Sequence, residues 1–94
     1  MALEVQLEET GHKGRFYIRK QEKDIAEMTY SAAGKDRIII DHTQVDKEYR
    51  GQDLGKQMVY KAVEYARNRQ IKIVPLCPFA NAIFKKNEEI RDVL

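Results

Sequence analysis

The hydrophobic pattern of this chain changes its period once, near residue 50, and that change limits the folds open to it. Before it, apolar and polar residues alternate in short runs, which is the pattern of β-strands. After it, apolar residues recur every three or four positions and so share one side of a helix. These residues are Leu54, Met58, Ala62, Tyr65 and Ala66. Several strands followed by one long amphipathic helix predict an α+β fold.

We expect four strands in the first half of the chain, joined by short turns as a mostly antiparallel meander. The predicted strands cover residues 4–8, 15–19, 25–30 and 37–45. The later predicted elements are a helix from about 51 to about 69, a fifth strand over 71–74 and a shorter helix over 78–86. Pro78 suits the first turn of that second helix, whereas residues 87–94 give only a weak helical signal. The expected order is therefore β-β-β-β-α-β-α.

Length and composition add a few limits. A chain of 94 residues is expected to form one domain over residues 1–94. Its longest apolar run, residues 38–40, is far too short to span a bilayer, so we expect no membrane association. The opening MALEVQLEET is acidic and has no signal-peptide pattern, and the single cysteine fits a reducing compartment, so we expect a cytoplasmic protein. A net charge of +2 argues against a general nucleic-acid surface.

The junction between strand and helix, YRGQDLGK at residues 49–56, has the features of an anion site. The first N–H groups of a helix have no partner within it and point outward at the positive end of the helix dipole. Gly51 and Gly55 allow a ligand to approach the backbone, while Arg50 and Lys56 add positive charge. These features favour phosphate binding; the alternative is an ordinary helix start with two solvated cations.

The same residues resemble motif A of the GCN5-related N-acetyltransferases, Arg/Gln-x-x-Gly-x-Gly/Ala. In that family the motif opens the main helix and holds the pyrophosphate of acetyl-CoA. Arg50 matches the first motif residue, Gly55 the last, and Gly51 the small residue common after the arginine. The resemblance implies that acetyl-CoA is the cofactor. It also implies that the pyrophosphate accepts hydrogen bonds from backbone N–H groups, namely those of Gln52, Leu54, Gly55 and Lys56.

Asp53 departs from the motif, because it stands where the family has its middle glycine. A carboxylate close to a pyrophosphate would repel it. Its side chain is therefore expected to point away or to cap the helix, as aspartate often does at a helix N-terminus. If it faces the ligand instead, CoA binding should be weak.

The segment PLCPFANAIFKK, residues 75–86, is aligned with the family pattern Asn-x-x-Ala-x-x-Leu-Tyr through Ala80 and Ile83. Phe84 then replaces the tyrosine that protonates the departing thiolate, and it has no hydroxyl to do so. Cys77 replaces the asparagine that contacts the pantetheine arm. The stretch around Cys77 is similar to that of the very small YjdJ-like acetyltransferases, and this resemblance covers nearly the whole chain.

Cys77 has two interpretations. It is either a buried thiol that behaves as a small hydrophobic residue, or a nucleophile or acyl-binding group beside the thioester. The predicted second helix begins next to it, and a helix N-terminus stabilises a thiolate.

His42 is the candidate base for an amine acceptor, since histidine titrates near neutral pH and lies on the strand before the motif. Strict alternation would place His42 on the same face as Ile38 and Ile40; the alternative is a structural histidine. We assign no role to His12. One cysteine and one suitable histidine fall short of a ligand set, so we expect no metal.

Two routes of acetyl transfer remain open. In the first, which we favour, the amine attacks acetyl-CoA directly while backbone N–H groups near Val45 polarise the thioester carbonyl. In the second, Cys77 is acetylated first and then passes the group on.

The alternative functions are a CoA- or acyl-CoA-binding module with little catalysis and a small protein-interaction domain. A chain this short predicts an open acceptor site suited to a protein amine or a polyamine, and a monomer or weak homodimer.

Overall fold

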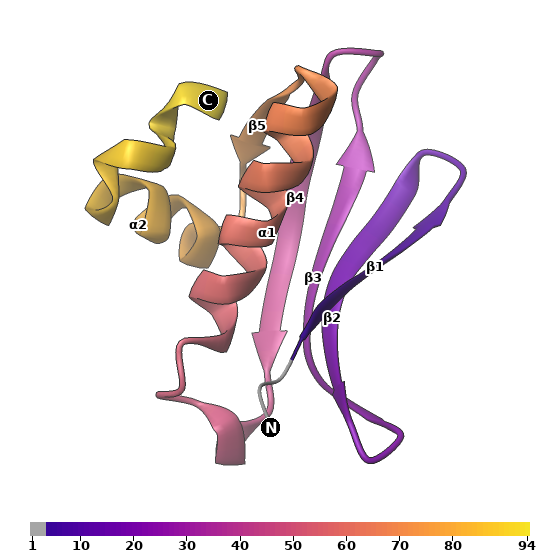
Figure 1. The fold of residues 1–94 in the computed structure, drawn as a ribbon, viewed down its shortest axis with the longest axis vertical. Coiled ribbons are helices and arrows are strands. Elements are labelled where there is room, and N and C mark those ends of the chain that lie inside the picture. The colour runs from indigo at the N-terminus through magenta and orange to yellow at the C-terminus, as the bar shows by residue number, and fades with distance from the viewer. Residues whose placement is uncertain (1–3) are drawn as a thin grey trace.

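The chain forms one five-stranded mixed sheet whose strands follow the order of the sequence (Figure 1). This computed structural model describes residues 4–94, and the first three residues of the expected domain lie outside the described residues. The strands are β1 (Val5–Thr10), β2 (Lys13–Lys20), β3 (Lys23–Ala32), β4 (Arg37–Val45) and β5 (Lys72–Pro75). The helices are α1 (Leu54–Arg69) and α2 (Pro78–Lys86), with short 3-10 turns η1 (Lys47–Tyr49) and η2 (Glu88–Val93).

The predicted architecture is confirmed. Strands β1 to β4 are antiparallel neighbours, and β5 returns parallel to β4 after the crossover through α1. The long helix begins at Leu54 rather than near residue 51, because Gly51 and Asp53 have positive φ angles of 89° and 60° that no α-helix contains. The weak signal at the end of the chain is a 3-10 turn, η2.

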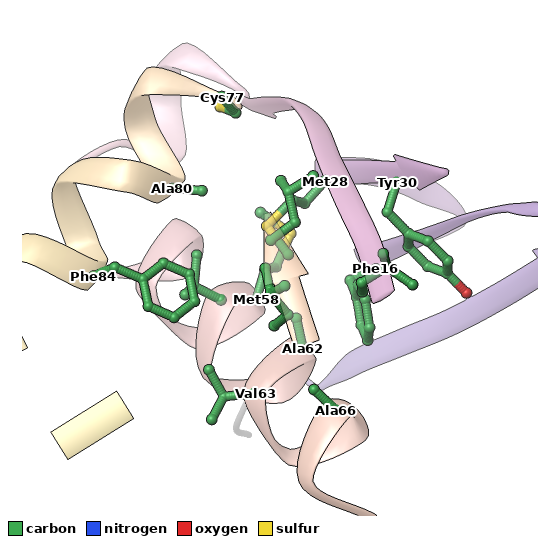
Figure 2. Close-up of a cluster of buried hydrophobic side chains, with 14 of the residues drawn as sticks. Phe16, Met28, Tyr30, Met58, Ala62, Val63, Ala66, Cys77, Ala80 and Phe84 are labelled. Carbon is green, nitrogen blue, oxygen red and sulfur yellow. The ribbon is translucent and has the colours of Figure 1, made fainter. Parts of the chain in front are cut away.

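The core lies between α1 and the sheet and continues under α2 (Figure 2). Phe16 and Met28 reach it from the sheet, Met58 and Ala62 from α1, and Phe84 from α2, each at most 1% exposed. Full burial of each large apolar side chain stabilises the fold by about 1.5–3 kcal/mol. This packing fixes both helices against the strands that carry the candidate site.

Strands β4 and β5 pair over a short stretch and then separate. Their register runs from Arg37 beside Lys72 to Ile40 beside Pro75. The last link between them is the Cys77 N–H, which donates to the Ile40 carbonyl at 3.1 Å. Beyond it, residues 42–45 of β4 pair with β3 only, so that strand edge is left open where the candidate site lies.

A β-bulge at Asp41 corrects one prediction. Tyr30 pairs with Ile40 but Thr29 pairs with His42, so Asp41 is left without a partner in the ladder. The extra residue reverses the alternation of side chains beyond it. His42 consequently lies on the face away from α1 and not with Ile40, as strict alternation would have it. Thr43, paired with the buried Met28, lies on the α1 face instead.

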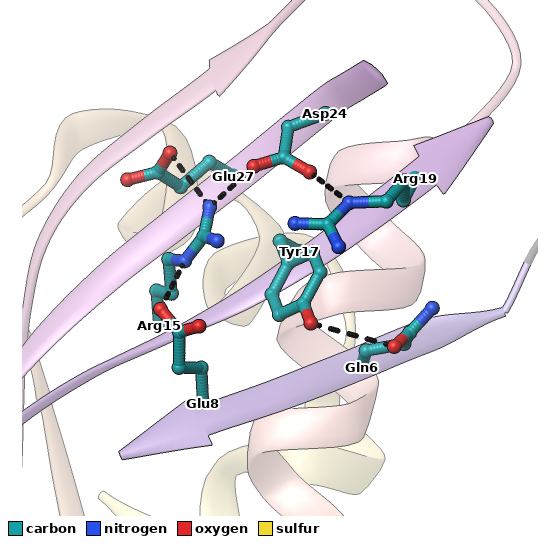
Figure 3. Close-up of polar contacts among 7 residues, drawn as sticks. All are labelled: Gln6, Glu8, Arg15, Tyr17, Arg19, Asp24 and Glu27. Atoms are coloured by element: carbon teal, nitrogen blue, oxygen red, sulfur yellow. Dashed lines mark hydrogen bonds and ion pairs between the residues drawn. The ribbon is translucent and has the colours of Figure 1, made fainter. Parts of the chain in front are cut away.

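The other face of the sheet is polar (Figure 3). The Arg15 guanidinium donates hydrogen bonds there to three carboxylates, those of Glu8 at 3.0 Å, Asp24 at 2.7 Å and Glu27 at 3.3 Å. The same guanidinium stacks over the Tyr17 ring, 4.1 Å from its centroid.

Within residues 4–94, no helix has both the length and the apolar character needed to cross a membrane.

Candidate active site

A cavity of about 1100 Å³ opens where the end of β4, the start of α1 and the helix α2 meet. Its volume exceeds the roughly 300–1,000 Å³ of pockets for drug-sized ligands, so it suits a longer molecule. From β4 and the following loop it is lined by His42, Thr43, Gln44, Val45, Tyr49, Arg50, Gly51 and Asp53. From α1 and α2 it is lined by Leu54, Gly55, Lys56, Phe79, Ala82, Ile83, Lys86 and Asn87.

The first turn of α1 points into this cavity with its backbone donors free. The N-cap residue, Asp53, makes no side-chain capping hydrogen bond. The first recorded helical bond is donated by Gln57 to the Asp53 carbonyl, so the N–H groups of Leu54, Gly55 and Lys56 have no partner in the helix. Such groups, at the positive end of the helix dipole, form an anion site.

Three cationic side chains line the same cavity: Arg50, Lys56 and Lys86. Against them stands the carboxylate of Asp53. The excess of positive charge favours a polyanionic ligand at the helix start. The Arg50 Nε also donates to the Val45 carbonyl at 3.3 Å, which ties the motif loop to the end of β4.

Asp53 occupies a left-handed backbone conformation, with φ 60° and ψ 23°. This explains why the family motif has glycine at this position, since only glycine adopts it without strain and aspartate is among the few residues that tolerate it. The Asp53 side chain was expected either to point away from the ligand or to cap the helix, and it makes no capping hydrogen bond. The residue instead lines the cavity.

Gly55 is needed for the packing of α2 against α1. A Cβ at this position would lie 2.2 Å and 2.3 Å from two ring carbons of Phe79. The space that we assigned to an approaching ligand is therefore occupied in part by a side chain of the protein itself. Phe79 is 46% exposed and lines the cavity.

The open edge of β4 supplies further backbone donors. Asp46 donates to the Ile25 carbonyl, which makes Val45 and Ala26 a non-hydrogen-bonded pair. The peptide groups of Val45, and of Thr43 two residues earlier, therefore point away from β3 and toward the gap left by β5. The Val45 N–H thus faces the open edge of β4.

Cys77 is the N-cap of α2, as predicted from the position of Pro78 (Figure 2). Its side chain is 5% exposed, and its thiol donates to the Thr43 hydroxyl at 3.3 Å. Burial alone would raise the pKa of Cys77. When the sulfur is ionised, hydrogen bonds donated to it by the Thr43 hydroxyl and by the N–H groups of Ala80, Phe79 and Thr43 outweigh burial, so the pKa of Cys77 lies below its usual value.

His42 lines the cavity but does not meet Cys77. Its cross-strand partner is Thr29, on the polar face of the sheet, whereas the recorded partners of the thiol are Thr43 and the first turn of α2. The Cys–His pair considered from the sequence is therefore not formed. In the part of the chain from residue 4 onward, no group of three or more metal-ligating side chains occurs.

The remaining aligned residues separate into two sets. Most of the residues predicted to bind the cofactor line the cavity: Val45, Arg50, Gly51, Leu54, Gly55 and Lys56. The exception is Gln52, which is exposed in the loop and does not line the cavity. Ile83 lines the cavity, but Ala80 and Phe84 are buried in the core, so the position of the family tyrosine faces the interior here.

Reasoning from the sequence missed several lining residues, among them Thr43, Phe79 and Lys86. Thr43 was hidden by the bulge, which has no signature in the sequence. Phe79 and Lys86 lie on a helix whose position relative to α1 depends on tertiary packing. Only the positive charge of Lys86 near a predicted helix end offered a weak signal.

The fold agrees with the comparisons to known proteins. Residues 15–93 match the family of GCN5-related N-acetyl-transferases. A GCN5-like protein from Staphylococcus aureus, solved by NMR, is 35% identical; the match covers 94% of this chain and 85% of that one, with a TM-score of 0.72. The chain therefore belongs to the GCN5-related N-acetyltransferase family.

Two further relatives are more distant. Protein NATD1 of Danio rerio is 27% identical over 64 residues, which cover 68% of this chain and 58% of that protein, so the chain spans little more than half of its length. A Clostridium acetobutylicum protein described as a predicted acetyltransferase and solved with acetyl-CoA is 16% identical. That match covers 80% of this chain and 56% of that one, with a TM-score of 0.65, and it supports the fold alone.

Proposed function

We propose that this protein transfers an acetyl group from acetyl-CoA to an amine. The observation that carries the proposal is the uncapped start of α1, which opens into a large cavity beside Arg50, Lys56 and Lys86. Membership of the acetyltransferase family supports acetyl-CoA as the ligand of this anion site. The diphosphate of acetyl-CoA binds the N–H groups of Leu54 to Lys56, and the pantetheine arm follows the open edge of β4.

The thioester lies beside β4 in this arrangement. The N–H of Val45 donates to the thioester carbonyl oxygen and stabilises the negative charge that develops there during attack. His42 reaches the cavity from the polar face of the sheet, and it accepts the proton that the amine must lose to become a nucleophile. The neutral amine nitrogen then bonds to the carbonyl carbon and gives up to solvent the extra proton that attack leaves on it, the carbon–sulfur bond breaks, and CoA leaves as a thiol after it gains a proton.

Direct transfer is the route that we favour, because Cys77 is 5% exposed and does not line the cavity. Its lowered pKa supports the other route, in which the thiolate takes the acetyl group first. Intact-protein mass measured after mixing with acetyl-CoA alone separates the two. An added acetyl group that is lost in Cys77→Ala would establish the second route.

The acceptor is proposed to be an amine of a protein or a polyamine. The cavity is formed by one strand end, one loop and two helices, and among residues 4–94 no helix covers the polar face of the sheet beside His42. An acceptor presented from outside suits this site better than one that must be enclosed.

The second candidate function is a CoA- or acyl-CoA-binding module with little catalysis. Two observations favour it: Asp53 places a carboxylate in the anion site, and Phe84 removes the hydroxyl that protonates the leaving thiolate. Release of free CoA from acetyl-CoA, followed with poly-lysine and with spermidine as acceptors, distinguishes the candidates. An enzyme releases CoA only with an acceptor present, and His42→Gln should slow that release. A binder retains acetyl-CoA unchanged with either acceptor.

A further inference from the structure

The side chain that links the buried cysteine to the cavity is Thr43. Its hydroxyl lies 3.3 Å from the Cys77 sulfur, and the residue lines the cavity, whereas Cys77 does not. Any proton that moves between the thiol and a ligand in the cavity therefore has Thr43 on its way. The bulge at Asp41 makes this contact possible, because without it Thr43 would face the opposite side of the sheet.

The reaction needs such a proton. When the amine displaces CoA, the leaving thiolate must be protonated, and the position aligned with the family tyrosine carries Phe84, a buried ring without a hydroxyl. A threonine hydroxyl donates one hydrogen bond and accepts others at the same time. Thr43 can therefore accept a proton from the Cys77 thiol while it donates its own to a sulfur in the cavity.

We propose that the Thr43 hydroxyl couples the Cys77 thiol to the cavity and delivers the proton that the departing CoA thiolate takes up. The Cys77 S–H bond breaks, its proton goes to the Thr43 oxygen, and the Thr43 proton goes to the CoA sulfur. Cys77 is left as a thiolate, which the N–H groups of Phe79 and Ala80 stabilise. The proton that the nitrogen gives up after attack passes through solvent and restores the thiol, so transfer from the neutral amine neither gains nor loses a proton overall.

This inference rests on the proposed function, since it assumes that CoA places its sulfur near β4. It can be tested without knowing the acceptor. Cys77 is the only cysteine of the chain, so its titration can be followed from the ¹³Cβ resonance of protein labelled at cysteine. The variants are Thr43→Val, which keeps the shape but removes the hydroxyl, and Thr43→Ser, which keeps the hydroxyl.

Without ligand, we expect the titration midpoint of Cys77 to move upward in Thr43→Val and to return toward the wild-type value in Thr43→Ser. With ligand, CoA should shift the midpoint in the wild type and in Thr43→Ser, but not in Thr43→Val. Desulfo-CoA, which lacks the sulfur, should leave the midpoint unchanged in all three. A purely structural Thr43 would not produce this dependence on the ligand's sulfur.

The outcomes separate the inference from the function on which it rests. If CoA binds, as followed by amide shifts at the start of α1, and the Cys77 midpoint responds equally to CoA and desulfo-CoA or ignores Thr43, the inference is wrong. If CoA does not bind at all, the proposed function is wrong and the inference falls with it. Should Thr43→Val unfold, the wild-type comparison of CoA with desulfo-CoA still decides whether the thiol senses the ligand's sulfur.

Discussion

Phe79 of α2 lies directly against Gly55 in the first turn of α1, so closely that a Cβ on the glycine would come within 2.2 Å of the ring. This contact brings the start of α2, next to Cys77, to the start of α1, where the candidate anion site lies. It also means that the small residue in the motif is required by the protein before any ligand arrives.

The variant Gly55→Ala tests this contact. Because Phe79 is 46% exposed, its ring can move aside, so we expect a loss of about 1–3 kcal/mol in the free energy of unfolding rather than failure to fold. In a Phe79→Ala background the same substitution should cost much less, since the clash is gone. Denaturant unfolding of both single variants and the double variant measures the coupling. Strictly additive effects would contradict the contact.

Asp53 combines a strained backbone with an unfavourable charge, and the two can be separated by substitution. Asp53→Asn removes the charge but keeps a residue that tolerates positive φ, so CoA affinity should rise with little change in stability. Asp53→Ala also removes the charge, but we expect it to destabilise the fold by about 1 kcal/mol because alanine adopts this conformation less readily. Calorimetric titration with CoA gives the affinities. An Asn variant that binds CoA no more tightly than the wild type would place the carboxylate away from the ligand.

Lys86 is the cation that sequence reasoning missed, and it should contribute to CoA binding. Lys86→Gln is expected to weaken CoA affinity by about 1.4- to five-fold, the size of an exposed charge interaction of roughly 0.2–1 kcal/mol. The loss should shrink as salt is added. Lys61→Gln is the matched control, because Lys61 is an exposed α1 lysine that pairs with Glu64 and does not line the cavity. Equal effects from both variants would mean that only net charge matters.

The acid stability of the protein should depend on Glu9. Hydrogen bonds from the Tyr65 and Tyr30 hydroxyls, at 2.7 and 2.8 Å, together with the charge of Arg69, hold the pKa of Glu9 below its ordinary value of 4.5. A carboxyl whose pKa is lowered by folding stabilises the fold fully above its unfolded-state pKa, and this contribution is lost as the pH falls through its folded-state pKa.

Glu9→Gln should therefore be less stable than the wild type at pH 7, and the difference should diminish below about pH 4.5. Urea unfolding between pH 7 and pH 3 provides the measurement. Asp24 also has a lowered pKa, through Arg19 and Arg15, so the wild type and the variant should share the rest of the acid dependence. A difference that stays constant with pH would show that Glu9 is not ionised in this cluster.

The sequence predicted the order of elements because each one carries a local pattern. Alternation marks the strands, recurrence every three or four residues marks α1, and Pro78 marks the start of α2. The candidate anion site could be proposed for the same reason, since residues 50–56 lie next to one another in the chain.

The rest of the site depends on tertiary contacts, which leave no local pattern. The bulge at Asp41 arises from pairing with β3, and it moved His42 to the polar face and Thr43 to the α1 face. The contact between Cys77 and Thr43 joins residues 34 positions apart. A hydrophobic period or motif within one segment cannot predict a contact between residues so far apart in the sequence.

The central claim is that the start of α1 binds the diphosphate of CoA, and the most direct measurement is a titration of ¹⁵N-labelled protein with CoA followed by ¹H–¹⁵N spectra. We predict saturable shifts of the amides of Leu54, Gly55 and Lys56 and of Val45, with much smaller shifts along the polar face around Arg15. Unchanged Leu54 to Lys56 amides at millimolar CoA, with the fold intact, would contradict the account.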